Sequence, residues 1–274
     1  MITNILTMLS YGFMVRAILV GILVSLCLAL LGVSLVLKRY SMIGDGLSHV
    51  GFGAVSVAMA LGFAPLAVAV PVVMAAAFLL LRISAEGSIR GDAAIAIISS
   101  SALAVGVTVA ALSSGINSDV HSYLFGSVLA MSSGDVWLSV ILSVVVLALY
   151  IVCYNRIFAV TFDETFGRAT GVNVNAYNTL LAMLTAVTVV VGMRMMGALL
   201  ISSLVIFPAL SAMRVFQSFR SVIICSALVS VGSFIMGILA SYFLNTPAGA
   251  SVVLSNLLVF IVFGAIGAIF KRTE

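Results

Sequence analysis

The side chains best suited to bind a metal ion or a proton lie in the stretch KRYSMIGDGLSHVG, residues 38–51. In this stretch, Asp45 and His49 are four positions apart. On a helix, positions i and i+4 share a face, so this carboxylate and imidazole could contact one common atom. An ionisable residue in an apolar segment is costly to bury, which favours a functional role. The alternative is structural: Asp45 caps a helix that begins near Gly46, and a neighbouring carbonyl accepts a hydrogen bond from His49.

An aspartate with a histidine suits a borderline cation such as Zn²⁺, Mn²⁺ or Fe²⁺. Mg²⁺ prefers oxygen ligands throughout, and no cysteine accompanies the pair, as a Cu(I) site would require. Two ligands make an incomplete coordination shell, which is typical of a transient site on a path, particularly if a symmetry-related chain adds a second pair. We therefore predict a metal or proton role for the pair and no permanently bound cofactor.

Other acidic residues are weaker candidates. Asp119 and His121, in NSDVHSYLFG, are two positions apart and do not share a helical face, although they could help to receive a cation. Asp163 and Glu164 are interpreted as the solvated start of a helix. The cysteines lie in apolar runs without metal-like spacing and are interpreted as small core residues: Cys27, Cys153 and Cys225.

The elements that must position the Asp45–His49 pair are membrane helices. The 274 residues are 64% hydrophobic and only 7% charged, against about 25% charged in soluble domains. We predict an all-α polytopic protein with eight or nine transmembrane helices and a single membrane domain over residues 1–274. The expected spans are 16–37, 47–62, 64–82, 93–113, 134–154, 174–193, 196–212, 220–241 and 248–270, of which the second and seventh are short enough to be broken or re-entrant.

The basic residues predict the orientation, because they stay on the cytoplasmic side of a membrane protein. With nine spans and the C-terminus inside, only Arg16 and Arg194 lie outside. The other ten basic residues lie inside: Lys38, Arg39, Arg82, Arg90, Arg156, Arg168, Arg214, Arg220, Lys271 and Arg272. The net charge of +4 is thus an orientation signal, and no nucleic-acid partner is expected.

Two segments on the expected cytoplasmic side stand out. The longest polar internal connection is NRIFAVTFDETFGRATGVN, residues 155–173. The stretch FPALSAMRVFQSFR, residues 207–220, mixes basic and apolar residues and predicts a short amphipathic helix. The residues alone leave two interpretations of that helix open, which are a helix lying on lipid and a docking element for a cytosolic partner.

Several catalytic motifs are absent from the sequence. No G-x-x-x-x-G-K-[ST] phosphate loop, H-E-x-x-H or G-x-S-x-G occurs, so no ATPase, metalloprotease or serine-hydrolase signature is present. We therefore expect a protein that is not an enzyme. A stand-alone cation transporter is the rival hypothesis, but it would normally have coupling carboxylates in several spans.

Several ordered stretches resemble one family: KRYSMIGDGLSH, YLFGSVLAMSSGDV, GRATGVNVNAYN, MGALLISSLVIFPALSA and NTPAGASVVL. Together they look like the permease subunits of bacterial ABC importers for zinc, manganese and iron(II), over residues 11–272. The resemblance implies a type II ABC importer-like permease fold in the bacterial cytoplasmic membrane. It also implies a homodimer, two cytosolic P-loop ATPase subunits and an extracytoplasmic metal-binding protein.

The resemblance also implies roles for particular residues. Asp45 and His49 match the family's metal-path ligands, and Gly46 departs from the larger residue that relatives often carry. The zinc branch is favoured by MRMMGALLISSLVIFPALSA and TPAGASVVL, with Mn²⁺ or Fe²⁺ as alternatives. The coupling element for the ATPase falls at 208–220, with Pro208, Met213, Arg214, Phe216 and Gln217, and the binding protein could dock on Arg16 and Arg194.

Overall fold

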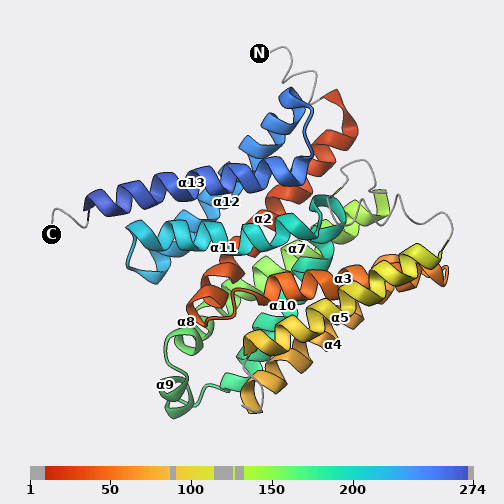
Figure 1. The fold of residues 1–274 in the computed structure, drawn as a ribbon. Helices are drawn as coiled ribbons and strands as arrows, with labels where there is room; N and C mark the ends of the chain where they lie inside the picture. Colours follow the sequence, from red (N-terminus) through yellow and green to blue (C-terminus); the bar gives the residue numbers. More distant parts are fainter. Residues whose placement is uncertain (1–9, 87–90, 114–125, 127–132, 271–274) are drawn as a thin grey trace.

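The chain folds into a bundle of helices, shown as a ribbon in Figure 1. The computed structural model describes residues 10–86, 91–113, 126 and 133–270, and these ranges contain no strand. The elements are α2 (Gly12–Leu37), α3 (Ile43–Ala60), α4 (Pro65–Glu86), α5 (Gly91–Leu112), α7 (Ser133–Val152), α8 (Tyr154–Phe162), α9 (Glu164–Ala169), α10 (Val174–Met196), α11 (Ala198–Val215), α12 (Phe219–Leu244) and α13 (Ala248–Phe270).

Each of the nine predicted spans is a helix in this structure. Within the described residues, seven helices are long and apolar enough to cross a membrane by length and composition, namely α2, α4, α5, α7, α10, α12 and α13. The remaining two are α3, whose apolar character is diluted by Asp45, Ser48 and His49, and α11, whose apolar part covers only Leu200–Val215. These are the two segments that the sequence singled out as short, and the all-α membrane fold class is confirmed.

Consecutive long helices run back and forth between two ends of the bundle (Figure 1). One end, which we call the basic end, holds seven of the described basic residues: Lys38, Arg39, Arg82, Arg156, Arg168, Arg214 and Arg220. The short helices α8 and α9 lie at this end too, and α9 projects from the bundle (Figure 1). Arg16 lies near the start of α2, at the opposite end. Arg90, Lys271 and Arg272 fall outside the described residues.

Helix α3, which carries Asp45 and His49, is enclosed by α4, α5, α10 and α11. Glycines allow this close approach. A Cβ at Gly53 would lie 2.6 Å from the carbonyl oxygen of Ala102 on α5, so a larger residue would push the helices apart. Gly46 is also buried, and a Cβ there would lie 2.7 Å from Cγ2 of Ile95. Small residues at helix contacts thus set the position of α3.

The separate amphipathic helix predicted for 207–220 does not form. Residues 208–215 are the last turns of α11, and α12 begins at Phe219 with Ser218 as its N-cap. Packing against α13 accounts for the continuation of α11. The rings of Phe207 and Phe260 are 5.7 Å apart, and a Cβ at Gly267 would lie 2.8 Å from the carbonyl oxygen of Arg214. An amphipathic pattern cannot reveal that a neighbouring helix covers its apolar face.

Candidate metal site

Asp45 lies in the first turn of α3 and does not cap it. The helix begins at Ile43, and its N-cap is Met42, which makes no side-chain capping hydrogen bond. The interpretation of Asp45 as a helix cap is therefore wrong. A carboxylate in the first turn is still favourable, because it faces the positive end of the helix dipole.

The two predicted ligands do lie together. Nε2 of His49 is 3.6 Å from Oδ2 of Asp45, and the side chains are 24% and 36% exposed, respectively. Two atoms that bind one Zn²⁺ at 2.0–2.2 Å, at an angle between tetrahedral and trigonal, are about 3.3–3.8 Å apart. One cation could therefore contact both atoms with little rearrangement, so the residues fit a divalent metal ion.

Ser202 of α11 is a third member of the site that sequence reasoning missed. Its hydroxyl donates a 2.8 Å hydrogen bond to Oδ1 of Asp45, across 157 positions of sequence. This bond fixes one carboxylate oxygen and leaves Oδ2 facing His49. Nothing in the sequence marks Ser202 among the many serines of the spans, and only the packing of α11 against α3 reveals it.

Among the described residues, the imidazole of His49 has a polar neighbour at Nε2, which is Oδ2 of Asp45, and none at Nδ1. Its Nδ1 is buried and has no hydrogen-bond partner among the described residues. A metal-binding histidine usually donates its second N–H to a fixed acceptor, which orients the ring. The described residues also contain no group of three or more His, Cys, Asp or Glu side chains that could hold a metal ion. The described part of one chain thus offers a pair of potential ligands and not a closed site.

The residues predicted to couple to an ATPase divide into an inward and an outward set. Pro208 is buried, and Met213 packs partly buried against the core. The guanidinium of Arg214 is 5.5 Å from the centroid of the Phe260 ring. Phe216 and Gln217, in the turn between α11 and α12, are exposed. Arg214 and Arg220 are exposed as well, so the 208–220 stretch presents these two basic side chains together with the turn at the basic end.

Helix α9 is a second exposed feature of the basic end. Asp163 is its N-cap, and its carboxylate accepts hydrogen bonds from the backbone N–H groups of Thr165 and Phe166 at 2.8 and 3.0 Å. These bonds hold the pKa of Asp163 below its usual value. The aromatic rings of Phe162 and Phe166 are 57% and 60% exposed on either side of this cap. The predicted helix start at Asp163–Glu164 is confirmed.

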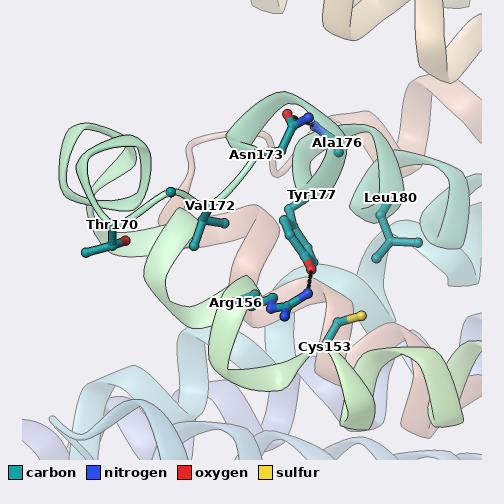
Figure 2. Close-up of a pocket in the computed structure, with 9 residues that line it drawn as sticks. Cys153, Arg156, Thr170, Val172, Asn173, Ala176, Tyr177 and Leu180 are labelled. Atoms are coloured by element: carbon teal, nitrogen blue, oxygen red, sulfur yellow. Dashed lines mark hydrogen bonds between the residues drawn. The ribbon is translucent and has the colours of Figure 1, made fainter.

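A cavity of about 710 Å³ lies beside α9, between α8 and the start of α10 (Figure 2). Arg156 donates a 2.6 Å hydrogen bond to the hydroxyl of Tyr177 across it. Its other lining residues are Cys153, Thr170, Gly171, Val172, Asn173, Ala176 and Leu180. The basic end therefore contains a cavity next to the projecting helix α9.

The remaining predicted residues are not brought to the Asp45–His49 pair. Arg16 is exposed on α2 near the opposite end of the bundle from the basic residues. The side chain of Arg194 falls outside the described part of the chain, although its backbone belongs to the last turn of α10. Asp119 and His121 also fall outside the described residues. Their roles stay predictions.

The part of the chain that the structure describes contains seven helices of spanning length and an Asp–His pair on a further helix, which defines a multi-pass membrane protein. Residues 10–267 match the ABC 3 transport family. The chain therefore belongs to this family, and it is the membrane permease of a metal ABC importer.

Relatives and a solved structure support this assignment. The manganese import system permease protein ScaB of Streptococcus gordonii is 28% identical, over 92% of this chain and 91% of its own. The high-affinity zinc uptake system membrane protein ZnuB of Haemophilus influenzae is 30% identical, over 93% of this chain and 96% of its own. The structure of PsaBC from Streptococcus pneumoniae in complex with Fab superposes with a TM-score of 0.86 at 28% identity, covering 96% of this chain and 95% of that one.

Proposed function

We propose that this permease carries a divalent transition-metal ion into the cytoplasm, with Zn²⁺ as the first candidate cargo. The observation that carries the proposal is the 3.6 Å separation of Nε2 of His49 and Oδ2 of Asp45, which suits two ligands of one cation. The carboxylate lowers the cost of bringing a dication into a medium of low dielectric constant, which a neutral imidazole cannot do.

A homodimer would complete the coordination shell. Two Asp–His pairs facing a shared axis supply four ligands, the number that Zn²⁺ prefers. Because each histidine lacks a partner for Nδ1 among the described residues, the ring could adjust as the ion enters and leaves. The metal would then be a transient occupant and not a resident cofactor.

The energy would come from two cytosolic P-loop ATPase subunits that dock at the basic end. The predicted coupling stretch 208–220 contributes its exposed turn, with Phe216 and Gln217, while Pro208 and Met213 precede that turn on α11 and are buried and partly buried, respectively. We add α9 to this docking surface, because the helix projects from the bundle at the same end (Figure 1) and its Phe166 is exposed. Exposed aromatic rings are typical anchors of protein interfaces.

An extracytoplasmic metal-binding protein would deliver the ion at the opposite end. We propose Arg16 and Arg194 as contacts for acidic residues on its rim. Such contacts steer association more than they strengthen it. With these two arginines outside, the basic end is cytoplasmic, as the distribution of Lys and Arg predicts.

Zinc is preferred over manganese and iron on sequence grounds alone. Relatives named for manganese and for zinc have similar identities of 28% and 30%, and an Asp–His pair accepts either metal. The stretches MRMMGALLISSLVIFPALSA and TPAGASVVL resemble the zinc branch. Mn²⁺ and Fe²⁺ are therefore the alternatives that an experiment must separate.

The test is uptake by the reconstituted importer. The permease is placed in proteoliposomes with its ATPase subunits inside and its binding protein outside, and uptake of radioactive zinc, manganese and iron is measured with and without ATP. ATP-dependent zinc uptake that excess manganese does not suppress supports the proposal. Preferential uptake of manganese or iron corrects the cargo only, whereas transport without the ATPase subunits would favour the stand-alone transporter.

A further inference from the structure

An ion pair joins the projecting helix α9 to the end of α2. Nζ of Lys38 lies 2.7 Å from Oε1 of Glu164 and donates a second hydrogen bond, of 3.0 Å, to the carbonyl oxygen of Val160. The Lys38 side chain is only 7% exposed. A nearly buried ammonium group is costly unless it is paired and hydrogen-bonded. This contact is therefore specific, unlike an ordinary surface ion pair.

Glu164 is held from several sides. Oε1 also accepts a 3.1 Å hydrogen bond from Nδ2 of Asn178 on α10, and Nη2 of Arg168 lies 3.9 Å from Oε2. Partial burial acts to raise the pKa of Glu164, but the hydrogen bonds from Lys38 and Asn178 outweigh it and hold this pKa below its usual value. The glutamate is therefore ionised at neutral pH, and α9 is anchored to both α2 and α10.

The chain between Lys38 and the metal pair is stiff. The backbone N–H groups of Tyr40 and Ile43 donate to the carbonyl oxygens of Leu35 and Tyr40, at 2.8 and 3.0 Å. Arg39 adopts a left-handed conformation, with φ of 62°, that reverses the chain after α2. Helix α3 starts at Ile43, and Asp45 follows in its first turn. A displacement of Lys38 would thus move the start of α3 instead of being absorbed by a loose loop.

The α9 side of the contact is equally well ordered. Its N-cap Asp163 accepts two backbone hydrogen bonds, and the hydroxyl of Thr170 donates to the carbonyl oxygens of Phe166 and Gly167 at 3.1 and 3.0 Å. A push on the exposed ring of Phe166 would therefore move α9 as a unit, together with Glu164.

We propose that the Lys38–Glu164 contact is the joint through which movement of α9 reaches α3 and repositions Asp45 and His49. Lys38 and Glu164 are then positioning residues for transport, although neither touches the cargo. This inference rests on the proposed function, because it requires an ATPase that moves α9. An ion pair that only stabilised the fold would leave the coupling between hydrolysis and transport unchanged.

The experiment measures metal ions imported per ATP hydrolysed by the complete importer in proteoliposomes. Lys38→Met removes the charge and keeps the length of the side chain, and Glu164→Gln removes the opposite charge. Lys38→Arg is the conservative variant, and Arg39→Gln is the matched control, because it removes a neighbouring exposed charge outside the joint. The ratio of ions to ATP does not depend on the amount of folded protein, and co-purification of the ATPase subunits reports assembly.

We expect Lys38→Met and Glu164→Gln each to lower the ratio about fivefold or more, the lower end of coupling between sites. Lys38→Arg should keep more than half of the wild-type ratio, and Arg39→Gln all of it. Wild-type ratios in both charge-removing variants would overturn the inference, as would an Arg variant as poor as the Met variant or an equal loss in Arg39→Gln. If the wild-type importer moves no metal at all, the proposed function fails instead, so the two failures are distinguishable.

Discussion

Replacing Asp45 with asparagine separates the charge of the metal pair from its geometry. Asparagine has nearly the same size as aspartate, and its amide oxygen can accept the 2.8 Å hydrogen bond that Ser202 now donates. Helix α3 does not depend on Asp45 as a cap, because its N-cap is Met42. The substitution should therefore leave the fold intact and remove only the negative charge beside His49.

The size of the effect follows from the surroundings of the pair. A dication passing through a dimer of the Asp45→Asn variant would lack one compensating charge per protomer, and an uncompensated charge at the centre of a membrane helix costs about 2.5–3.5 kcal/mol. Asp45 lies in the first turn of α3 and its side chain is 36% exposed, so this cost is an upper limit. Uptake should therefore fall by up to about 70- to 400-fold, since about 1.36 kcal/mol corresponds to a factor of ten in rate. His49→Ala removes a neutral ligand and should reduce uptake less.

The assay is ATP-dependent uptake of radioactive zinc in proteoliposomes, with permease content and ATPase co-purification measured in the same samples. Ser202→Ala is the matched control, because it keeps the charge of Asp45 and removes only one hydrogen bond. We expect this control to lose about tenfold, in line with a bond to a charged group. Wild-type uptake by the Asp45→Asn variant would refute the reasoning and leave Asp45 with a structural role.

The other predictions concern docking, packing and pH. Phe216→Asp should weaken co-purification of the ATPase subunits about five- to thirtyfold, as expected for loss of an exposed aromatic anchor, and normal assembly would contradict that role. Arg16→Glu should slow association of the binding protein and reduce its dependence on salt, as measured by stopped-flow mixing, so unchanged kinetics would remove the idea. Gly53→Val should lower thermal stability by about 1–3 kcal/mol, because its Cβ would lie 2.6 Å from the Ala102 carbonyl oxygen; an unchanged melting temperature would contradict this packing. The lowered pKa of Glu164 predicts that its contribution to stability is complete above the usual pKa of glutamate and lost as the pH falls through the lowered value, so melting curves of wild type and Glu164→Gln should converge only in acid.

The spans could be predicted because hydropathy acts over whole helices. A run of about twenty apolar residues is typical of a helix that crosses a membrane. Even the two shorter segments, α3 and α11, are helices at the positions that the hydropathy pattern predicted. The end of α11 could not be predicted in the same way. Whether 208–215 continues the helix depends on Phe260 and Gly267 of α13, which lie some fifty positions away in the sequence.

The residues of the site that are close in the sequence could be predicted, whereas those on other helices could not. Asp45 and His49 lie one turn apart, so helix geometry alone brought them together. Ser202 approaches from another helix, and no local signal distinguishes it from the other serines. The Lys38–Glu164 contact is hidden for the same reason, since 126 positions separate its members. Residue type indicated the chemistry, and tertiary packing supplied the partners.

The weakness of the metal pair is itself consistent with transport. A closed four-ligand site within one chain would bind a dication tightly, and an ion in a deep energy well does not leave. Here one carboxylate oxygen is committed to Ser202, and the imidazole lacks a fixed acceptor at Nδ1 among the described residues. If the pair binds the ion as proposed, the described residues of each chain would attract it without enclosing it. Helix α3 packs against four other helices, so a movement of its neighbours would be transmitted to its first turn. In the proposed dimer, such a shift would change the distance between the two Asp45–His49 pairs. The affinity of the site for the ion would then rise and fall with that distance.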